Sequence, residues 1–438
     1  MAFEWQKDVV VWALKKGRCA LFEDCGLGKT LQQLMFAGEV AKHTQKPVMI
    51  FAPLAVVKQT VKESKKFHES VKGIRDMNEV DGAGVYITNY DIAEHFDLSN
   101  FGGVVLDESS ILKDFSSKTK QLLTDMCKCV EYRLCCTATP SPNDYTELGN
   151  HSDFLGIMTR QEMLATFFVH DGGNTSHWRL KGHAKKDFFK WLASWACCVT
   201  TPEDLGYPGD SYKLPELEIR ERIVKSGGMW DGESQSMLFA PTVQTLSQRR
   251  EARKDSLFQR VNLAAEIANS EDSQFLVWCD LNAESEMLSE SINDSVEVNG
   301  TDTPEHKVNS MENFGAGKIK CLVSKPSIAG WGMNWQNCHR MIFVGISDSF
   351  EAFYQAVRRC YRFGQKNKVQ VDIIISEADG AVKSNLERKQ REAEAMTKEL
   401  VMYTKDILKN DIKATHRIQE TYYATEKMII PDWLEGIK

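Results

Sequence analysis

The sequence predicts an α/β protein with two doubly wound domains in tandem. Two features indicate this fold: short apolar segments alternate with stretches of helical periodicity, and this alternation occurs twice along the 438 residues. The apolar segments contain few polar residues, as expected for parallel strands that are buried on both faces. An apolar content of 42% and a charged content of 26% fit such a globular chain and argue against a disordered one.

The first set of apolar segments predicts the sheet of a first domain, which we assign to residues 1–150. Its strands are expected at residues 19–22, 47–51, 84–88, 104–107 and 132–136. Residues 30–41 and 56–67 lie between these segments and have the periodicity of helices.

The second set predicts a second domain over residues 256–380, with strands at 274–279, 319–323, 340–344 and 369–375. Residues 151–255 are expected to hold a helical insertion, the last strand of the first domain and a linker. Residues 381–438 are rich in Glu, Lys, Arg, Ala and Leu. They are expected to form a C-terminal helical brace that packs back on the second domain.

Charge and cysteine content exclude several classes of protein. The formal net charge of −7 excludes a wholly basic nucleic-acid binder, although it is compatible with a local basic groove. None of the 12 cysteines belongs to a Cys-x-x-Cys pair, so the sequence does not indicate a zinc ribbon. The sequence has no apolar run of about 18 residues and no N-terminal secretion signal. We therefore expect a cytoplasmic protein with reduced thiols and no membrane contact.

The strongest signal for chemistry lies in residues 21–31, Leu-Phe-Glu-Asp-Cys-Gly-Leu-Gly-Lys-Thr-Leu. A strand precedes this loop and a helix follows it, so Gly26 and Gly28 allow the backbone to close around phosphates with its N–H groups pointing inward. Lys29 is placed to bind the β- and γ-phosphates of a nucleotide, and Thr30 to bind Mg²⁺. The general form of this loop has Gly where Glu23 stands.

A second signal lies about 80 residues further on, where an apolar strand ends in two acids. In residues 104–108, Val-Val-Leu-Asp-Glu, we predict that Asp107 holds Mg²⁺ and that Glu108 orients and activates the attacking water. The pair would mean little alone, but downstream of a phosphate loop it predicts hydrolysis of a nucleoside triphosphate.

These motifs resemble those of superfamily 2 helicase-type ATPases, and within them the Swi2/Snf2 group of double-stranded DNA translocases. Residues 23–30, Glu-Asp-Cys-Gly-Leu-Gly-Lys-Thr, are similar to that group's Asp-Glu-Met-Gly-Leu-Gly-Lys-Thr. Residues 53–59 are similar to its motif Ia, 87–90 to motif Ib and 137–140 to motif III. The resemblance implies two tandem RecA-like domains with ATP between them. It also implies that Gln6 reads the adenine and that Leu27 belongs to the nucleotide-binding loop.

The second domain carries the most specific part of the resemblance. Residues 327–335, Ser-Ile-Ala-Gly-Trp-Gly-Met-Asn-Trp, are similar to motif V. Residues 355–365, Gln-Ala-Val-Arg-Arg-Cys-Tyr-Arg-Phe-Gly-Gln, closely resemble motif VI, and the final Gly-Gln favours Snf2-like proteins over DEAD-box RNA helicases. The match implies that Gly332 and Gln355 lie at the nucleotide and that Arg359 and Arg362 are arginine fingers.

The same resemblance implies contacts to DNA and a coupling element. It assigns the DNA contacts to Lys58, Thr88, Asn89 and Ser327, and the coupling of ATP to DNA to Thr137, Ala138 and Thr139. Ser110 stands where the group commonly has His in motif II, so the coupling to motif III is expected to differ.

The implied function is an ATP-dependent double-stranded DNA translocase that uses ATP and Mg²⁺. Two alternatives stay open: a strand-separating DNA or RNA helicase of superfamily 2, and a DNA-binding regulatory protein switched by ATP. The compact size resembles a form found in phages and prophages. This implies a bacterial cytoplasm and, as partners, phage or host proteins of replication, recombination or restriction.

Overall fold

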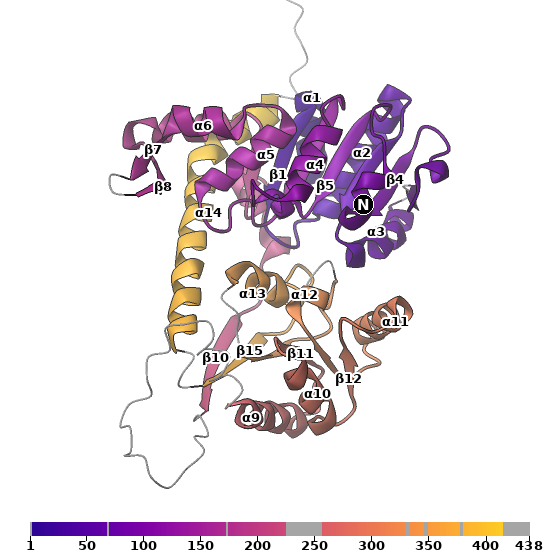
Figure 1. Ribbon diagram of the computed structural model, residues 1–438, viewed down its shortest axis with the longest axis vertical. Helices are drawn as coiled ribbons and strands as arrows, with labels where there is room; N and C mark the ends of the chain where they lie inside the picture. Colours follow the sequence, from indigo (N-terminus) through magenta and orange to yellow (C-terminus); the bar gives the residue numbers. More distant parts are fainter. Residues whose placement is uncertain are drawn as a thin grey trace, which may run out of the picture.

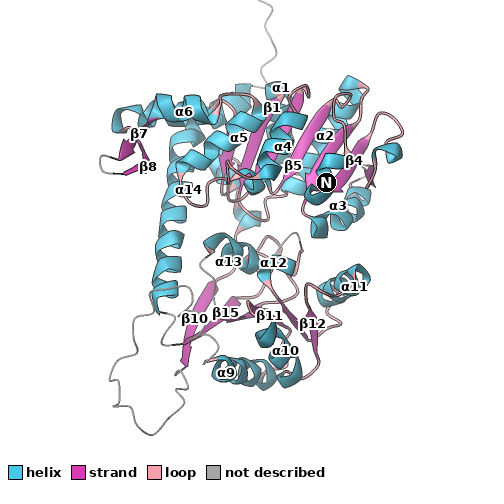
Figure 2. Ribbon diagram, viewed as in Figure 1, coloured by secondary structure: helices cyan, strands magenta, loops and turns pink. Residues whose placement is uncertain are grey.

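The computed structural model describes residues 2–67, 70–171, 174–224, 256–329, 333–345, 349–376 and 380–414. Within these ranges, two parallel sheets form two lobes, and a long helix, α14, runs along one side of both (Figures 1 and 2). Apolar clusters lie on both faces of each sheet, between the strands and the flanking helices. The predicted fold of two tandem doubly wound α/β domains is therefore confirmed.

The first lobe is built on a seven-stranded parallel sheet with the order β3-β4-β2-β5-β6-β1-β9. Its strands are β1 (Arg18–Glu23), β2 (Val48–Ala52), β3 (Val71–Gly73), β4 (Val85–Asn89), β5 (Gly103–Asp107), β6 (Tyr132–Thr137) and β9 (Ala196–Val199). Its helices are α1 (Glu4–Lys16), α2 (Lys29–Thr44), α3 (Leu54–Lys66), α4 (Lys118–Met126), α5 (Leu148–Leu155), α6 (Arg160–Phe167) and α7 (Lys185–Ala193).

The second lobe is built on a six-stranded parallel sheet with the order β10-β15-β14-β11-β13-β12. Its strands are β10 (Leu217–Val224), β11 (Phe275–Cys279), β12 (Ser295–Val298), β13 (Cys321–Ser324), β14 (Arg340–Val344) and β15 (Val369–Ser376). Its helices are α9 (Leu257–Ser270), α10 (Asn282–Ser291), α11 (Pro304–Gly315), α12 (Pro326–Ala329) and α13 (Phe350–Val357).

The segment between the two predicted domains contributes to both lobes. Strand β9 extends the first sheet, whereas β10 pairs in parallel with β15 of the second. An antiparallel hairpin of β7 (Phe168–Asp171) and β8 (Asn174–Leu180) lies between α6 and α7. The helical insertion predicted for this segment did not include the hairpin, because such short strands carry a weak alternation signal. The predicted polar linker falls almost entirely on residues 225–255, which lie outside the described residues.

Helix α14 (Gly380–Ala414) packs mainly on the first lobe, so the prediction that the C-terminal helices pack back on the second domain is wrong. Leu408 and Ile412 are buried in one core of the first lobe, and Leu400 is buried in the other. Trp12 Nε1 donates to Asp411 Oδ2 at 2.9 Å. An amphipathic pattern shows that a helix has an apolar face but not which surface that face covers.

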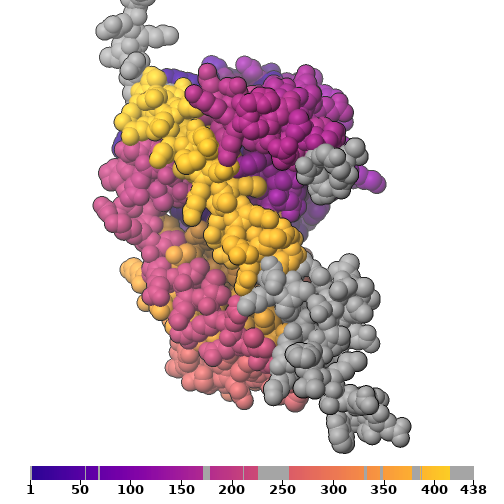
Figure 3. All heavy atoms as spheres, turned by 90° about the vertical axis from the view of Figure 1, so that its left-hand side faces the viewer, coloured from indigo at the N-terminus to yellow at the C-terminus, as the bar shows by residue number. Residues whose placement is uncertain are grey.

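The first half of α14 passes the second lobe, where Ala393 packs against the core. The helix therefore bridges the two lobes, as the space-filling view shows (Figure 3). Within the described ranges, no helix is both long enough and apolar enough to cross a membrane.

The position of α14 predicts a difference between two substitutions on the same helix. Leu408→Ala removes a side chain that is fully buried against the first lobe, and should lower the free energy of unfolding by about 2–5 kcal/mol. Met402→Ala, at a position that is 53% exposed, should change it by less than about 0.5 kcal/mol. Urea denaturation followed by circular dichroism measures both. Equal effects of the two substitutions would contradict the docking of α14 on the first lobe.

Candidate functional site

The loop between β1 and α2 is closed tightly by its glycines. Gly26 and Gly28 both have φ of +87°, a backbone conformation that favours glycine. A Cβ atom on Gly28 would lie 2.4 Å from Gln6 Nε2, and one on Gly26 would lie 2.9 Å from the backbone nitrogen of Phe363. The predicted phosphate loop therefore touches α1 on one side and the second lobe on the other.

Polar contacts hold this loop in place. Lys29 Nζ donates to the carbonyl oxygens of Glu23 at 2.7 Å and Asp24 at 3.0 Å. Gln6 Nε2 donates to the carbonyl oxygen of Leu27 at 2.8 Å, and Gln6 Oε1 accepts from the backbone of Phe3 at 3.0 Å. An incoming nucleotide would have to replace some of these contacts. Thr30 is half-buried in the first turn of α2.

The two predicted acids follow β5 directly, and Asp107 is held in place. Its carboxylate accepts from Gln33 Nε2 at 2.7 Å and from the backbone nitrogen of Glu108 at 3.1 Å. Burial raises the pKa of Asp107, while the hydrogen bond from Gln33 and the charge of Lys29 act to lower it. Gln33 was not predicted, because a glutamine inside a helix gives no signal in the sequence.

Glu108 has an unusual backbone conformation and a buried carboxylate oxygen without a hydrogen-bond partner among the described residues. Its backbone adopts a left-handed conformation with φ of +52°, which is uncommon for a residue with a side chain. Its Oε2 atom is buried and has no hydrogen-bond partner among the described residues. Burial and the neighbouring Asp107 raise the pKa of Glu108 to about 7. Such a carboxyl group is suited to exchange a proton near neutral pH.

The two predicted arginine fingers lie just after α13 of the second lobe. Arg359 is buried, and it makes two hydrogen bonds to Gln355. Its Nε donates to the carbonyl oxygen of Gln355 at 2.9 Å, and its Nη2 donates to Gln355 Oε1 at 2.7 Å. Arg362 Nη1 donates to the carbonyl oxygen of Met333 at 3.4 Å. Burial and the charge of Arg359 lower the pKa of Arg362 to about 10. Gln355, which was predicted to lie at the nucleotide, thus holds Arg359 in this structure.

The arginines are close enough to the acids of the first lobe to interact with them. The charge of Arg359 acts to lower the pKa values of both Asp107 and Glu108, although burial dominates each shift. The structure therefore brings together the phosphate loop, the two acids and the two arginines, which come from distant parts of the chain. Gly332, the remaining predicted nucleotide contact, lies outside the described residues.

Several further contacts between the lobes were not predicted. Asp24 of the phosphate loop binds Arg358 Nη2 at 2.7 Å and also accepts a hydrogen bond from the hydroxyl of Tyr354. Glu351, in the first turn of α13, forms an ion pair with Lys113. The sequence showed two adjacent arginines in motif VI but could not reveal that one of them faces the phosphate loop.

The predicted coupling residues lie between β6 and the second lobe. Thr137 Oγ1 accepts from the backbone nitrogen of Thr139 at 3.1 Å, and Thr139 Oγ1 donates to Glu351 Oε1 of the second lobe at 3.3 Å. Ala138 is half-buried between them, and Ser110 of motif II is buried. A contact between motif III and the second lobe is thus present.

The residues predicted to contact DNA differ in their accessibility. Lys58 on α3 and Ser327 on α12 are exposed. Thr88 is buried, so only its backbone could reach a phosphate group. Asn89 is half-buried, and its side chain accepts from the backbone nitrogen of Ile92 at 3.2 Å, where it caps a short 3-10 helix. The side chain of Thr88 is therefore enclosed by the protein, and that of Asn89 caps a helix.

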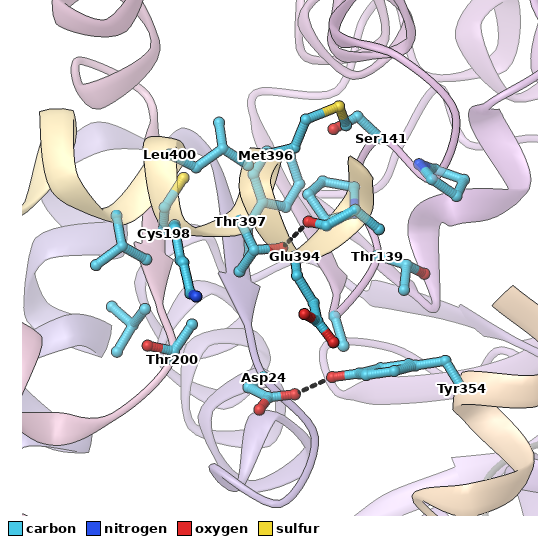
Figure 4. Close-up of a pocket in the computed structure, with 18 of the residues that line it drawn as sticks. Asp24, Thr139, Ser141, Cys198, Thr200, Tyr354, Glu394, Met396, Thr397 and Leu400 are labelled. Atoms are coloured by element: carbon cyan, nitrogen blue, oxygen red, sulfur yellow. Dashed lines mark hydrogen bonds between the residues drawn. The ribbon is translucent and has the colours of Figure 1, made fainter. Parts of the chain in front are cut away.

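A cavity of about 340 Å³ lies beside the phosphate loop. It is bounded by the ends of β1 and β9, the loop after β6, one side of α13, and α14 (Figure 4). Asp24 and Tyr354 meet at its edge, and Glu394 of α14 points toward them.

Two protein families match this chain. Residues 5–169 match the SNF2-related domain, and residues 254–364 match the helicase conserved C-terminal domain. The mouse DNA annealing helicase and endonuclease ZRANB3 is 25% identical over 154 residues, which are 31% of this chain and 14% of that protein. The ATP-dependent helicase FUN30 of Saccharomyces cerevisiae is 29% identical over 163 residues, which are 32% of this chain and 14% of that protein.

The chain thus matches only a small part of each of these curated relatives. Among solved structures, the Sulfolobus solfataricus SWI2/SNF2 ATPase core in complex with double-stranded DNA is 17% identical, with a TM-score of 0.43. That comparison covers 94% of each chain.

The pKa of Glu108 predicts the pH dependence of hydrolysis. Because this pKa is raised to about 7, the carboxyl group is protonated below that pH and cannot accept a proton from water. The value of kcat/KM should therefore rise with pH and level off above about 7, falling about tenfold for each pH unit below it. Steady-state phosphate release between about pH 5.5 and 8.5 measures this profile.

Glu147 provides the matched control, because its pKa is also raised to about 7 by burial. Glu147→Gln should leave the pH profile unchanged. If this substitution removed the transition near pH 7, Glu108 would not be its source.

Proposed function

Because the chain is an SNF2-related ATPase with a helicase C-terminal domain, we propose that it is an ATP-driven motor that moves along double-stranded DNA. One observation carries most of the weight: the phosphate loop and both acids belong to the first lobe, whereas the arginines belong to the second. A site divided in this way can complete itself only when the lobes are together. Hydrolysis and the relative position of the lobes are therefore coupled.

In this proposal the first lobe binds and positions the nucleotide. Gln6 exchanges its contact with Leu27 for the adenine, while Lys29 leaves the carbonyl oxygens of Glu23 and Asp24 for the phosphates. Glu108 orients the attacking water and accepts its proton. The buried oxygen of Glu108, which lacks a partner among the described residues, fits this role.

Mg²⁺ fits the residues at this site. The part of the chain that the structure describes holds no cluster of three or more His, Cys, Asp or Glu side chains that could bind a metal alone. Mg²⁺ commonly uses only one or two carboxylates together with the phosphates of its nucleotide. Asp107 and the hydroxyl of Thr30 would hold it. When bound, the ion would neutralise charge that develops on the phosphate oxygens.

The second lobe stabilises the transition state in this proposal. Arg359 and Arg362 bring positive charge to the oxygens of the transferred phosphoryl group, which is worth about 10³–10⁵ in rate for such residues. Arg359 must first release Gln355, and Arg362 must release the carbonyl oxygen of Met333.

Movement along DNA would follow from the same division. Lys58 lies on the first lobe and Ser327 on the second, and both are exposed, so each lobe can contact the DNA backbone. Contacts to phosphates carry little sequence information and weaken as the salt concentration rises. Strand β6, which ends at Thr137, pairs with β5, which ends at Asp107, and Thr139 contacts Glu351 of the second lobe. Thr137, Ala138 and Thr139 would therefore transmit the nucleotide state.

The biological setting is proposed from the resemblance alone. The compact form suggests a phage or prophage protein in a bacterial cytoplasm. Its partners would be phage or host proteins of replication, recombination or restriction.

Strand separation is a second candidate function, because the hairpin of β7 and β8 has the form of an element that can divide a duplex. The rings of His170 and Trp178 pair across it with centroids 3.8 Å apart, and aromatic rings of this kind can stack on bases. A strand-displacement assay distinguishes this activity from displacement of a triplex strand, which translocation alone achieves.

The proposal predicts how nucleic acids change the rate of ATP hydrolysis. Duplex DNA should raise the steady-state rate several-fold, and more strongly than single-stranded DNA or RNA, because both lobes bind the duplex backbone. Phosphate release at constant ionic strength with each nucleic acid measures the order of stimulation. Stimulation by single strands or RNA alone would favour the helicase alternative.

Glu108→Gln is the control for this measurement. The variant should bind ATP normally but hydrolyse it about 10²–10⁴-fold more slowly, because it cannot accept a proton. A wild-type protein that binds ATP without hydrolysing it under any condition would favour a switch over a motor.

A further inference from the structure

Two polar residues of α13 and Arg358, which caps its C-terminus, face the first lobe along a single stripe. Glu351, Tyr354 and Arg358 are spaced by three and four residues, and this spacing places them on one side of a helix. We name this set the docking stripe. Each member contacts a different part of the first lobe or shares a partner with its neighbour on the helix.

The C-terminal end of the stripe contacts the phosphate loop. Arg358 Nη2 lies 2.7 Å from Asp24 Oδ2, and the Tyr354 hydroxyl donates to Oδ1 of the same carboxylate. Asp24 Oδ1 also accepts from the backbone nitrogen of Cys25 at 2.6 Å, within the loop itself. The carboxylate of Asp24 therefore joins the backbone of the phosphate loop to α13.

The N-terminal end of the stripe contacts motif III and the residues that follow motif II. Glu351 pairs with Lys113, which follows motif II, and its Oε1 accepts from Thr139 Oγ1 of motif III at 3.3 Å. The three elements that surround the phosphates in the first lobe are thus each connected to one short helix of the second.

The pairing of Asp24 and Arg358 is shielded from water. Their side chains are 21% and 15% exposed, whereas another ion pair between the lobes, Lys62 with Glu312, has side chains that are 65% and 53% exposed. Burial acts to lower the pKa of Arg358, but Tyr354 and Asp24 raise it above its usual value. A buried charge whose partner is removed is strongly destabilised, whereas exposed pairs contribute little.

Packing places α13 within the second lobe, where Phe353, Ala356 and Val357 are buried in the core. On the side of α14, Phe350, Tyr354 and Arg358 border the cavity of about 340 Å³ (Figure 4). The directed contacts of the stripe then join α13 to the first lobe.

We propose that Arg358 is a positioning residue for ATP hydrolysis: by binding Asp24 it fixes the position of the two arginine fingers relative to the phosphate loop. Arg359 follows it directly in the chain, and Arg362 lies three residues further on, in the turn after α13. Closing of the phosphate loop around a nucleotide moves Asp24, and Arg358 carries this movement to Arg359. This inference rests on the proposed function and adds a residue that acts through others.

A double-mutant cycle tests the pair. Asp24→Asn removes a charge with little change in shape, and Arg358→Gln removes the opposite charge and shortens the side chain. Each should lower kcat for ATP about 100-fold, as a misplacement of about 1 Å can do, while the Kd for ATP changes less than about threefold. The double variant should be no slower than the slower single variant, because the two residues act as one unit. Arg358→Lys should recover part of the rate.

Glu312→Gln is the matched control, since it breaks an ion pair between the lobes that is exposed. It should leave the rate without DNA unchanged within about twofold. Tyr354→Phe removes only a hydroxyl and tests the same contact should a charge variant fail to fold. A loss of about tenfold in its kcat supports the inference, and a wild-type kcat overturns it.

Wild-type values of kcat in Arg358→Gln would also overturn the inference, as would a double variant whose loss equals the product of the single losses. Failure of the proposed function gives a different result, because it would appear in the wild-type protein itself, as absent hydrolysis or as hydrolysis that duplex DNA does not stimulate.

Discussion

Opposite charges face each other across the boundary between the two lobes. The first lobe presents Asp24, Asp107 and Glu108, and the second presents Arg358, Arg359 and Arg362. Taking such charges out of water is costly unless they are paired. Among these six described residues, Asp24 and Arg358 form an ion pair with each other across the boundary. Arg359 and Arg362 are bound to carbonyl oxygens and to Gln355 instead.

This arrangement leaves the site ready for a ligand with many negative charges. Arg362 has a lowered pKa of about 10, and Glu108 a raised pKa of about 7, so each charged form is disfavoured by its surroundings. Phosphate groups and a divalent cation would relieve both penalties. The connection of the lobes through α14, which is anchored on the first lobe by Leu408 and Ile412, keeps the second lobe near while the boundary rearranges.

The sequence predicted the fold well because parallel strands buried on both faces are nearly continuous apolar segments. It also identified the phosphate loop and the acids, since glycines, a lysine and adjacent carboxylates follow strands there. It did not predict the partner of α14, because an apolar helix face can cover either lobe. It missed Gln33, Glu351 and Arg358 for a related reason: their partners lie 74, 212 and 334 residues away, and contacts over such distances leave no local pattern.

If one ATP site is shared between the two lobes, hydrolysis depends on the arginines of the second lobe. Single-turnover hydrolysis should be compared in Arg359→Ala, Arg362→Ala and the control Arg388→Ala, whose side chain is exposed on α14. Both site variants should still bind ATP but hydrolyse it about 10³-fold more slowly or worse, with the control unchanged. Wild-type hydrolysis by both site variants would show that the first lobe acts alone and that the site is not shared.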